Sequence, residues 1–87
     1  MIKMKRKQGK SKEERAVEIN FGKLIKRLRL EYNFTQKQLA HKTGFTPQTI
    51  SSIENYGQNV GIGTIKLFAM AFDMTVPELI SFLEDSK

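Results

Sequence analysis

The side chains that most often carry catalysis or bind metals are scarce in this sequence. His41 is the only histidine, there is no cysteine, and no acidic pair stands near His41 at metal-ligand spacing. The glycine-rich phosphate-binding motif, the serine-nucleophile motif and the zinc-protease motif are also missing. His41 is therefore predicted to be an exposed or capping side chain. We expect that the protein is not an enzyme and that it binds no cofactor and no metal.

The main chemical feature of the sequence is its surplus of positive charge. Lys and Arg number 15 against 9 Asp and Glu, for a net charge of +6, and residues 1–20 hold seven of the basic and three of the acidic groups. Such a surplus favours a polyanion, such as nucleic acid, as the partner. Residues 1–12 are polar and basic, and we expect them to be disordered when the protein is alone. Two interpretations stay open: a solvated tail, or an arm that reaches DNA phosphates or the minor groove.

The size and composition indicate one small globular domain. The chain has 87 residues, of which 39% are hydrophobic. No run approaches the roughly 18 apolar residues of a membrane span, and no apolar segment follows the N-terminal basic residues as a secretory signal requires. We therefore expect a soluble cytoplasmic protein without a membrane partner.

Two short helices joined by a sharp turn are predicted within residues 35–55. Thr35 and Gln38 fit a capping box at the start of the first helix, and Gly44 stands where a left-handed residue would end it. Thr46 offers a hydroxyl as the next N-cap, with a proline directly after it. The apolar spacing predicts that the pair buries Leu39, Ala40, Thr43, Ile50 and Ile53.

The preceding helix combines one apolar face with basic residues elsewhere. Its apolar residues recur at three- and four-residue steps: Val17, Phe21, Leu24, Ile25, Leu28 and Tyr32. Two starting points stay open. Ser11 and Glu14 offer a capping box that would start the helix at residue 12. Alternatively, Gly22 costs about 1 kcal/mol inside a helix, and the well-formed part begins near Phe21.

A fourth helix is predicted over residues 64–72, after a glycine-rich loop. This segment, TIKLFAMAF, is apolar nearly all round. Such a pattern predicts a central helix that is buried on most sides, with Met70 and Phe72 in the core.

The last helix is predicted to begin after a capping box formed by Thr75 and Glu78. Its predicted apolar face consists of Val76, Leu79, Ile80 and Leu83. Phe82 is predicted to point away from this face, as one half of a dimer interface would. Residues 75–85 are therefore the candidate dimerisation segment, and the candidate interface residues are Phe82, Leu79 and Leu83.

Residues 21–80 resemble the Cro/C1-type helix-turn-helix family of phage repressors and bacterial regulators, also called the xenobiotic-response-element type. The matching segments are FGKLIKRLRLEY, TQKQLAHKTG, TPQTISSIEN, TIKLFAMAF and TVPELI, in order and with the expected gaps. The resemblance implies an all-α, five-helix, repressor-like DNA-binding domain over residues 13–87, preceded by the basic extension 1–12.

The same resemblance implies a function. We expect a transcriptional regulator, either a repressor or a controller protein, that binds a palindromic operator in double-stranded DNA as a homodimer. Its setting would be the nucleoid of a bacterium, with the gene carried by the bacterium or by a phage. A second hypothesis stays open: an antitoxin that neutralises a toxin partner and binds DNA secondarily.

Individual roles also follow from the resemblance. It places the helix that follows Thr46 in the major groove, where glutamine can pair with adenine and a threonine methyl can pack on thymine. Base contacts fall to Thr46, Pro47, Gln48, Thr49 and Ser52. Phosphate contacts fall to Lys23, Arg27, Gln36, Lys37, Lys42 and Asn55. Arg29 and Glu54 match an internal ion pair.

Three features of the sequence depart from the family pattern. Tyr56 stands where the family often has glycine, so Gly57 is expected to take the left-handed conformation instead. Val60 and Gly61 replace a frequent Pro-Ser pair, which removes the usual cap of the fourth helix. The helix over residues 47–55 contains no Lys or Arg. Base contact there must therefore be neutral, and the attraction to DNA must come from charges around it.

Overall fold

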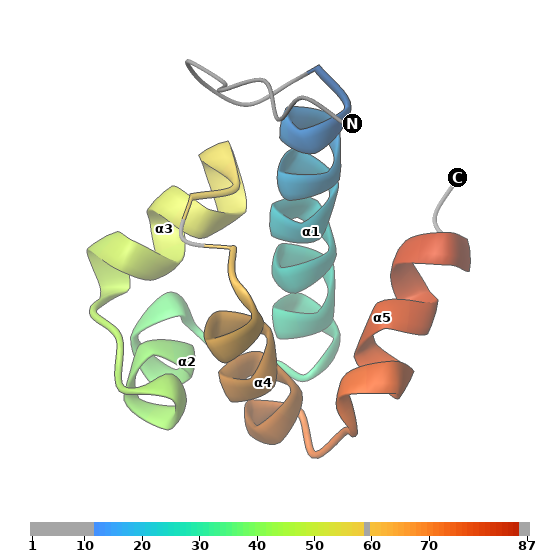
Figure 1. The fold of residues 1–87 in the computed structure, drawn as a ribbon. Coiled ribbons are helices and arrows are strands. Elements are labelled where there is room, and N and C mark those ends of the chain that lie inside the picture. The colour runs from blue at the N-terminus through green and yellow to red at the C-terminus, as the bar shows by residue number, and fades with distance from the viewer. Residues whose placement is uncertain (1–11, 59, 86–87) are drawn as a thin grey trace, which may run out of the picture.

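The computed structural model describes residues 12–58 and 60–85, and this part of the chain folds into five helices (Figure 1). The helices are α1 (Lys12–Glu31), α2 (Gln36–Thr43), α3 (Pro47–Tyr56), α4 (Ile62–Ala71) and α5 (Val76–Asp85). No strand occurs among the described residues, so the predicted all-α, five-helix fold class is confirmed. α1 begins at Lys12, the earlier of its two predicted starting points. The basic segment 1–11 lies outside the described residues, and its role stays a prediction.

The long helix α1 packs chiefly against α3 and α5. Figure 1 shows α2 and α3 on one side of α1, α5 on the other side and α4 between them. The ring of Phe21 on α1 meets the ring of Phe68 on α4 edge to face, with the centroids 6.0 Å apart. The core that these helices enclose consists of Phe21, Leu24, Ile25, Leu28, Leu39, Ala40, Ile50, Ile53, Phe68, Ala69, Phe72 and Leu79.

The two ends of the predicted apolar face of α1 lie outside the core. Val17 is 56% exposed, whereas Phe21, one turn later, is buried. Tyr32 packs its ring against Phe72 at 5.0 Å and donates its hydroxyl hydrogen to the Phe72 carbonyl oxygen at 3.0 Å. Tyr32 is nevertheless 41% exposed.

α4 is a surface helix rather than the enclosed central helix that its composition predicted. Phe68 and Ala69 are buried, and Phe72 directly after the helix is fully buried, as predicted. Met70, however, is 65% exposed, so its predicted place in the core is wrong, and Ile62 is 77% exposed. The reason is geometric: α4 packs against α2 and α5 and turns its remaining side to solvent. Its first turn has no side-chain cap, as the absence of serine before it predicted.

α5 packs Val76, Leu79 and Leu83 of its predicted apolar face on the core, and it adds Phe82 to them. The capping box is present, since the Thr75 N–H donates to Oε1 of Glu78 at 2.8 Å and the Glu78 N–H donates to Oγ1 of Thr75 at 3.2 Å. Leu79 is fully buried, and Phe82 is half-buried against the core, so the prediction that it points away is wrong. Phe82 lies three residues after Leu79 and therefore shares its side of the helix.

Candidate nucleic-acid interface

Local hydrogen bonds fix where α2 and α3 begin and where α2 ends. The Thr35 N–H donates to Oε1 of Gln38 at 2.8 Å, and the Gln38 N–H donates to Oγ1 of Thr35 at 3.0 Å, so the predicted capping box is present. α2 ends at Gly44, which has the predicted left-handed conformation with φ of 83°. Thr46 then caps α3 by accepting the Thr49 N–H at 3.1 Å, with proline in the first turn.

Two glycines let α3 lie directly against α1. A Cβ atom at Gly22 would overlap the Ile53 carbonyl oxygen, so the helix-weakening glycine of α1 marks the place where the two backbones touch. Gly57 ends α3 with φ of 70°, as predicted, and a Cβ there would overlap the backbone of Glu18. Together with the fully buried Ile50, these contacts fix the depth and tilt of α3 on the domain.

A buried ion pair fixes the same helix from the other side. Arg29 donates from Nε to Oε2 of Glu54 at 2.6 Å and from Nη2 to Oε1 at 3.3 Å. Its Nη1 donates to the Phe34 carbonyl oxygen at 2.9 Å, and Nε2 of Gln36 donates to Oε1 of Glu54 at 3.1 Å. The carboxylate is therefore paired and hydrogen-bonded, as a buried charge must be. It links α1, the start of α2 and the end of α3.

The outward side of α3 is polar and uncharged. Gln48 and Asn55 are exposed and Ser52 is half-buried. Asn55 donates from Nδ2 to the Ser51 hydroxyl at 3.2 Å. Within the described residues, the side chains of Gln48 and Ser52 make no hydrogen bond, so their donors and acceptors are available to a ligand. We call this side, made by Gln48, Ser51, Ser52 and Asn55, the outer face of α3.

Thr46, Pro47 and Thr49 lie at the start of the same helix. The hydroxyl of Thr46 donates to the hydroxyl of Thr49 at 3.0 Å, and Thr46 and Pro47 are exposed. Thr46 serves as the N-cap, so its oxygen is already engaged within the protein. Its methyl group and the ring of Pro47 remain as an apolar edge at the entrance of α3.

Three of the predicted phosphate-binding residues meet at the C-terminal end of α3. Lys23, Arg27 and Asn55 line a hollow of about 470 Å³ between α1 and α3. Arg27 also pairs with Glu31 of its own helix at 3.8 Å. Lys26 lines the same hollow and was missed by the sequence analysis, although its spacing of three residues from Lys23 placed it on the same side of the helix.

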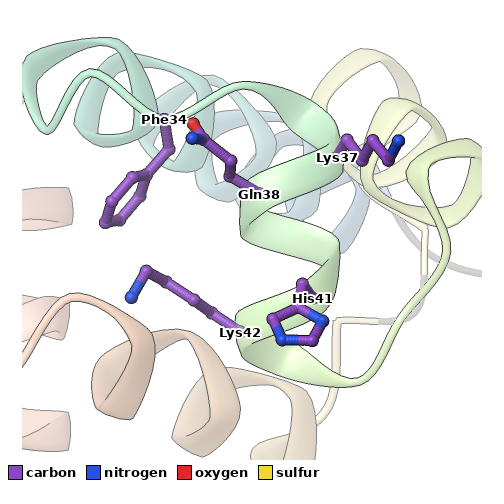
Figure 2. A pocket seen from close by; sticks show the side chains of 5 residues that line it. All are labelled: Phe34, Lys37, Gln38, His41 and Lys42. Carbon is purple, nitrogen blue, oxygen red and sulfur yellow. The ribbon is translucent and has the colours of Figure 1, made fainter.

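The structure does not gather the other three around this hollow. Gln36 is half-buried with its amide nitrogen on Glu54, so its side chain is partly engaged. Lys37 and Lys42 both project from α2, but Figure 2 shows them extending to opposite sides of the helix. Lys42 extends toward Phe34 and places Nζ 5.0 Å from the centroid of that ring.

Other kinds of site find little support in the described residues. Within residues 12–58 and 60–85, no helix combines the length and the apolar character that crossing a bilayer requires. In the same part of the chain, no three His, Cys, Asp or Glu side chains come together as a metal site would need.

A helix-turn-helix whose second helix exposes a polar face, with basic residues of α1 beside it, is typical of DNA-binding proteins. A helix-turn-helix family model matches residues 25–79. The chain belongs to this family, and it is a DNA-binding transcription regulator of the Cro/C1 type. The family and the fold are those of DNA-binding regulators rather than of enzymes. No curated protein sequence matches the chain.

Several solved structures are similar to this chain. The wild-type restriction-modification controller protein C.Esp1396I has 26% sequence identity and a TM-score of 0.73, over 79% of this chain and 90% of that chain. The controller protein C.AhdI from Aeromonas hydrophila has 28% identity and a TM-score of 0.67, over 74% of this chain and 97% of that chain. The clp gene regulator ClgR from Corynebacterium glutamicum shares the fold at 17% identity, with a TM-score of 0.73 over 80% of this chain and 74% of that chain.

Proposed function

We propose that this regulator binds a palindromic operator in double-stranded DNA as a homodimer and reads bases with the outer face of α3. The observation that carries the proposal is the pair of free polar side chains, Gln48 and Ser52, on a helix that the turn after α2 presents to solvent. Helices of this kind lie in the major groove with the N-terminal residues against the base edges. Gln48 pairs with N6 and N7 of an adenine, and Ser52 donates to or accepts from a neighbouring base.

Residues at the start of α3 complete the base contacts. The Thr49 methyl group packs on a thymine methyl, and the apolar edge formed by Thr46 and Pro47 contacts the adjoining base pair. Because this surface has no formal charge, it supplies discrimination between sequences rather than most of the binding energy.

The attraction to DNA comes from basic residues beside α3. Lys23, Lys26 and Arg27 face one strand of the backbone from the hollow at the C-terminal end of α3, with Asn55 as a neutral donor. Lys37 serves a second phosphate near the start of α2. The main-chain N–H groups of the first turn of α2, from Gln36 onward, add the positive end of a helix dipole.

Two copies are needed because one such helix reads only a few base pairs. The apolar surface that a second copy would cover lies on α4 and α5. Leu79 is fully buried within one copy, and Phe82 and Leu83 are half-buried. The more exposed apolar side chains are Met70 and Ile62, two turns apart on α4. We therefore centre the homodimer contact on α4, with Phe82 and Leu83 at its margin.

The regulator is a repressor or a controller protein within this proposal. The similarity to two restriction-modification controller proteins, at 26% and 28% identity, supports the controller type. Selection of bound sites from random DNA duplexes tests the whole proposal. We expect two inverted half-sites that each contain an adenine, with centres about one helical turn or a multiple of it apart. Recovery of unrelated sequences, without any shared half-site, would overturn it.

A further inference from the structure

A second basic surface lies on α2 and at Phe34, just before α2 begins. Phe34, Lys37, Gln38, His41 and Lys42 line a hollow of about 360 Å³ (Figure 2). None of these residues belongs to α3. We call it the α2 hollow.

One side of the α2 hollow is an aromatic wall. Phe34 is half-buried, and its ring stacks on that of Phe72, with centroids 6.2 Å apart and planes inclined by 16°. Tyr32 packs beside both rings, so the wall is held rigidly by the core. The ammonium group of Lys42 lies 5.0 Å from the centroid of the Phe34 ring, within the range of a cation–π contact. A fixed aromatic surface therefore lies directly beneath a positive charge.

The charge around the α2 hollow is uncompensated. The sequence contains no Asp or Glu between Glu31 and Glu54. Lys37 and Lys42 are exposed, and within residues 12–58 and 60–85 neither forms an ion pair. His41 is exposed beside them and adds ring nitrogens that hydrogen-bond to a ligand. The complementary ligand is therefore anionic and also carries an apolar group.

We propose that the α2 hollow docks an acidic segment of a partner protein, in which an aromatic or branched aliphatic side chain flanked by Asp or Glu packs against Phe34. The Phe34 ring already stacks on Phe72 and lies under the Lys42 ammonium group, so the apolar side chain packs against the part of the half-buried ring that is still exposed. It displaces water there, which is favourable because it buries apolar area on both partners. The flanking carboxylates pair with Lys42 and accept a hydrogen bond from the ring N–H of His41. Such charge pairs set the orientation of the segment and raise its association rate.

A protein segment suits the α2 hollow better than the DNA backbone does. A phosphate gains nothing from an aromatic wall, whereas an apolar side chain does. Lys42 extends to the side of α2 that carries Phe34, opposite to Lys37 (Figure 2). The docked segment would therefore occupy a surface that remains open while α3 is bound to DNA, and a partner could be held beside the operator.

The test uses the full chain labelled with ¹⁵N and a synthetic peptide of about ten residues that contains Asp, Leu and a single Phe. We expect amide shifts on titration to concentrate in α2 and around Phe34. Replacing the Phe of the peptide with Ala, or its Asp residues with Asn, should each weaken binding by about fivefold or more, since each removes one half of the recognition. Shifts spread evenly over all basic segments, or no shift in α2, would overturn the proposal.

Two matched variants separate docking from general charge. Lys42→Gln should weaken binding of the peptide by about fivefold. Lys26→Gln removes the same charge from α1 and should change the affinity by no more than about twofold. Equal losses in the two variants would overturn the proposal. The last comparison measures how tightly the two variants Lys42→Gln and Lys37→Gln bind a random DNA duplex. If both lose the same affinity, Lys42 contacts phosphates and the proposal fails. The peptide titration contains no DNA, so its outcome does not depend on the operator.

Discussion

Gln36 and Glu54 join the start of α2 to the end of α3: Nε2 of the glutamine donates to Oε1 of the carboxylate at 3.1 Å. The same carboxylate is held by Arg29 of α1 at 2.6 Å. One buried acidic group therefore sets the mutual orientation of the three helices that form the DNA-binding unit. It also accepts a hydrogen bond from the side-chain amide nitrogen of Gln36. We therefore expect Gln36 to contact a phosphate through its main-chain N–H rather than through its side chain.

Removal of the Glu54 carboxylate should destabilise the domain strongly. Glu54→Ala leaves the Arg29 guanidinium buried with only the Phe34 carbonyl oxygen as a partner, and breaking a buried pair in this way costs about 3–5 kcal/mol. Urea unfolding followed by circular dichroism measures the loss. Glu31→Ala is the matched control, because the Arg27–Glu31 pair is exposed and should contribute less than about 1 kcal/mol. Similar losses in the two variants would contradict the role assigned to Glu54.

The contact between α1 and α3 should not tolerate a methyl group. Gly22→Ala would force Cβ onto the Ile53 carbonyl oxygen, and we expect a loss of about 1–3 kcal/mol from overpacking. At Gly63 on α4 an added Cβ meets no atom within 4 Å. Gly63→Ala should therefore be neutral or stabilising by up to about 1 kcal/mol. Thermal unfolding of the two variants compares them directly, and a stable Gly22→Ala protein would show that the helices can separate without cost.

The Gln48 side chain should carry sequence preference. Gln48→Ala is expected to cost about 1–3 kcal/mol on the selected operator and to flatten the preference at one base pair. Binding to a random duplex should change little, because Gln48 carries no charge. Fluorescence anisotropy with both duplexes at one salt concentration measures the difference. If both affinities fall equally, Gln48 does not read a base.

The basic residues that line the hollow at the end of α3 should contribute to the salt dependence of DNA binding. Each phosphate contact contributes about 0.9 to the slope of log affinity against log salt concentration. The double variant Lys23→Gln with Lys26→Gln should therefore lower the slope by about one to two on any duplex. The double variant Lys23→Arg with Lys26→Arg keeps both positive charges, serves as the control and should leave the slope unchanged. An unchanged slope in the glutamine double variant would place the phosphate contacts elsewhere.

The homodimer should depend on the exposed side of α4. Met70→Asp places a charge on a side chain that is 65% exposed, so the fold should persist while association weakens. Sedimentation equilibrium at micromolar protein should then report the mass of one chain. Leu30→Asp makes the same kind of change at an exposed site on α1 and should leave the mass of the dimer unchanged. A Met70→Asp protein that remains dimeric would move the interface back to the Phe82 and Leu83 margin of α5.

Local sequence determined most of the helical framework. The capping boxes begun by Thr35 and Thr75, the cap at Thr46 and the left-handed Gly44 each involve groups no more than four residues apart along the chain. Their energies favour one local conformation whatever lies around them, so residue type and spacing were sufficient to predict them. The buried apolar residues of α2 and α3 followed from their spacing along the helices, whereas the Arg29–Glu54 pair was implied only by the family resemblance.

Only the tertiary structure decided which surfaces meet. Met70 and Phe82 have similar apolar character, yet one lies in solvent and the other packs on the core, because that depends on where α4 and α5 contact helices distant in sequence. Lys37 and Lys42 are five residues apart on α2, so helix geometry alone turns them to different sides, but only the packing of Phe34 decides which of the two lies over an aromatic ring. The sequence by itself thus determined a helix-turn-helix whose second helix contains no Lys or Arg. Long-range packing decided which charges stand beside that helix, since side-chain placement depends on contacts that no local pattern encodes.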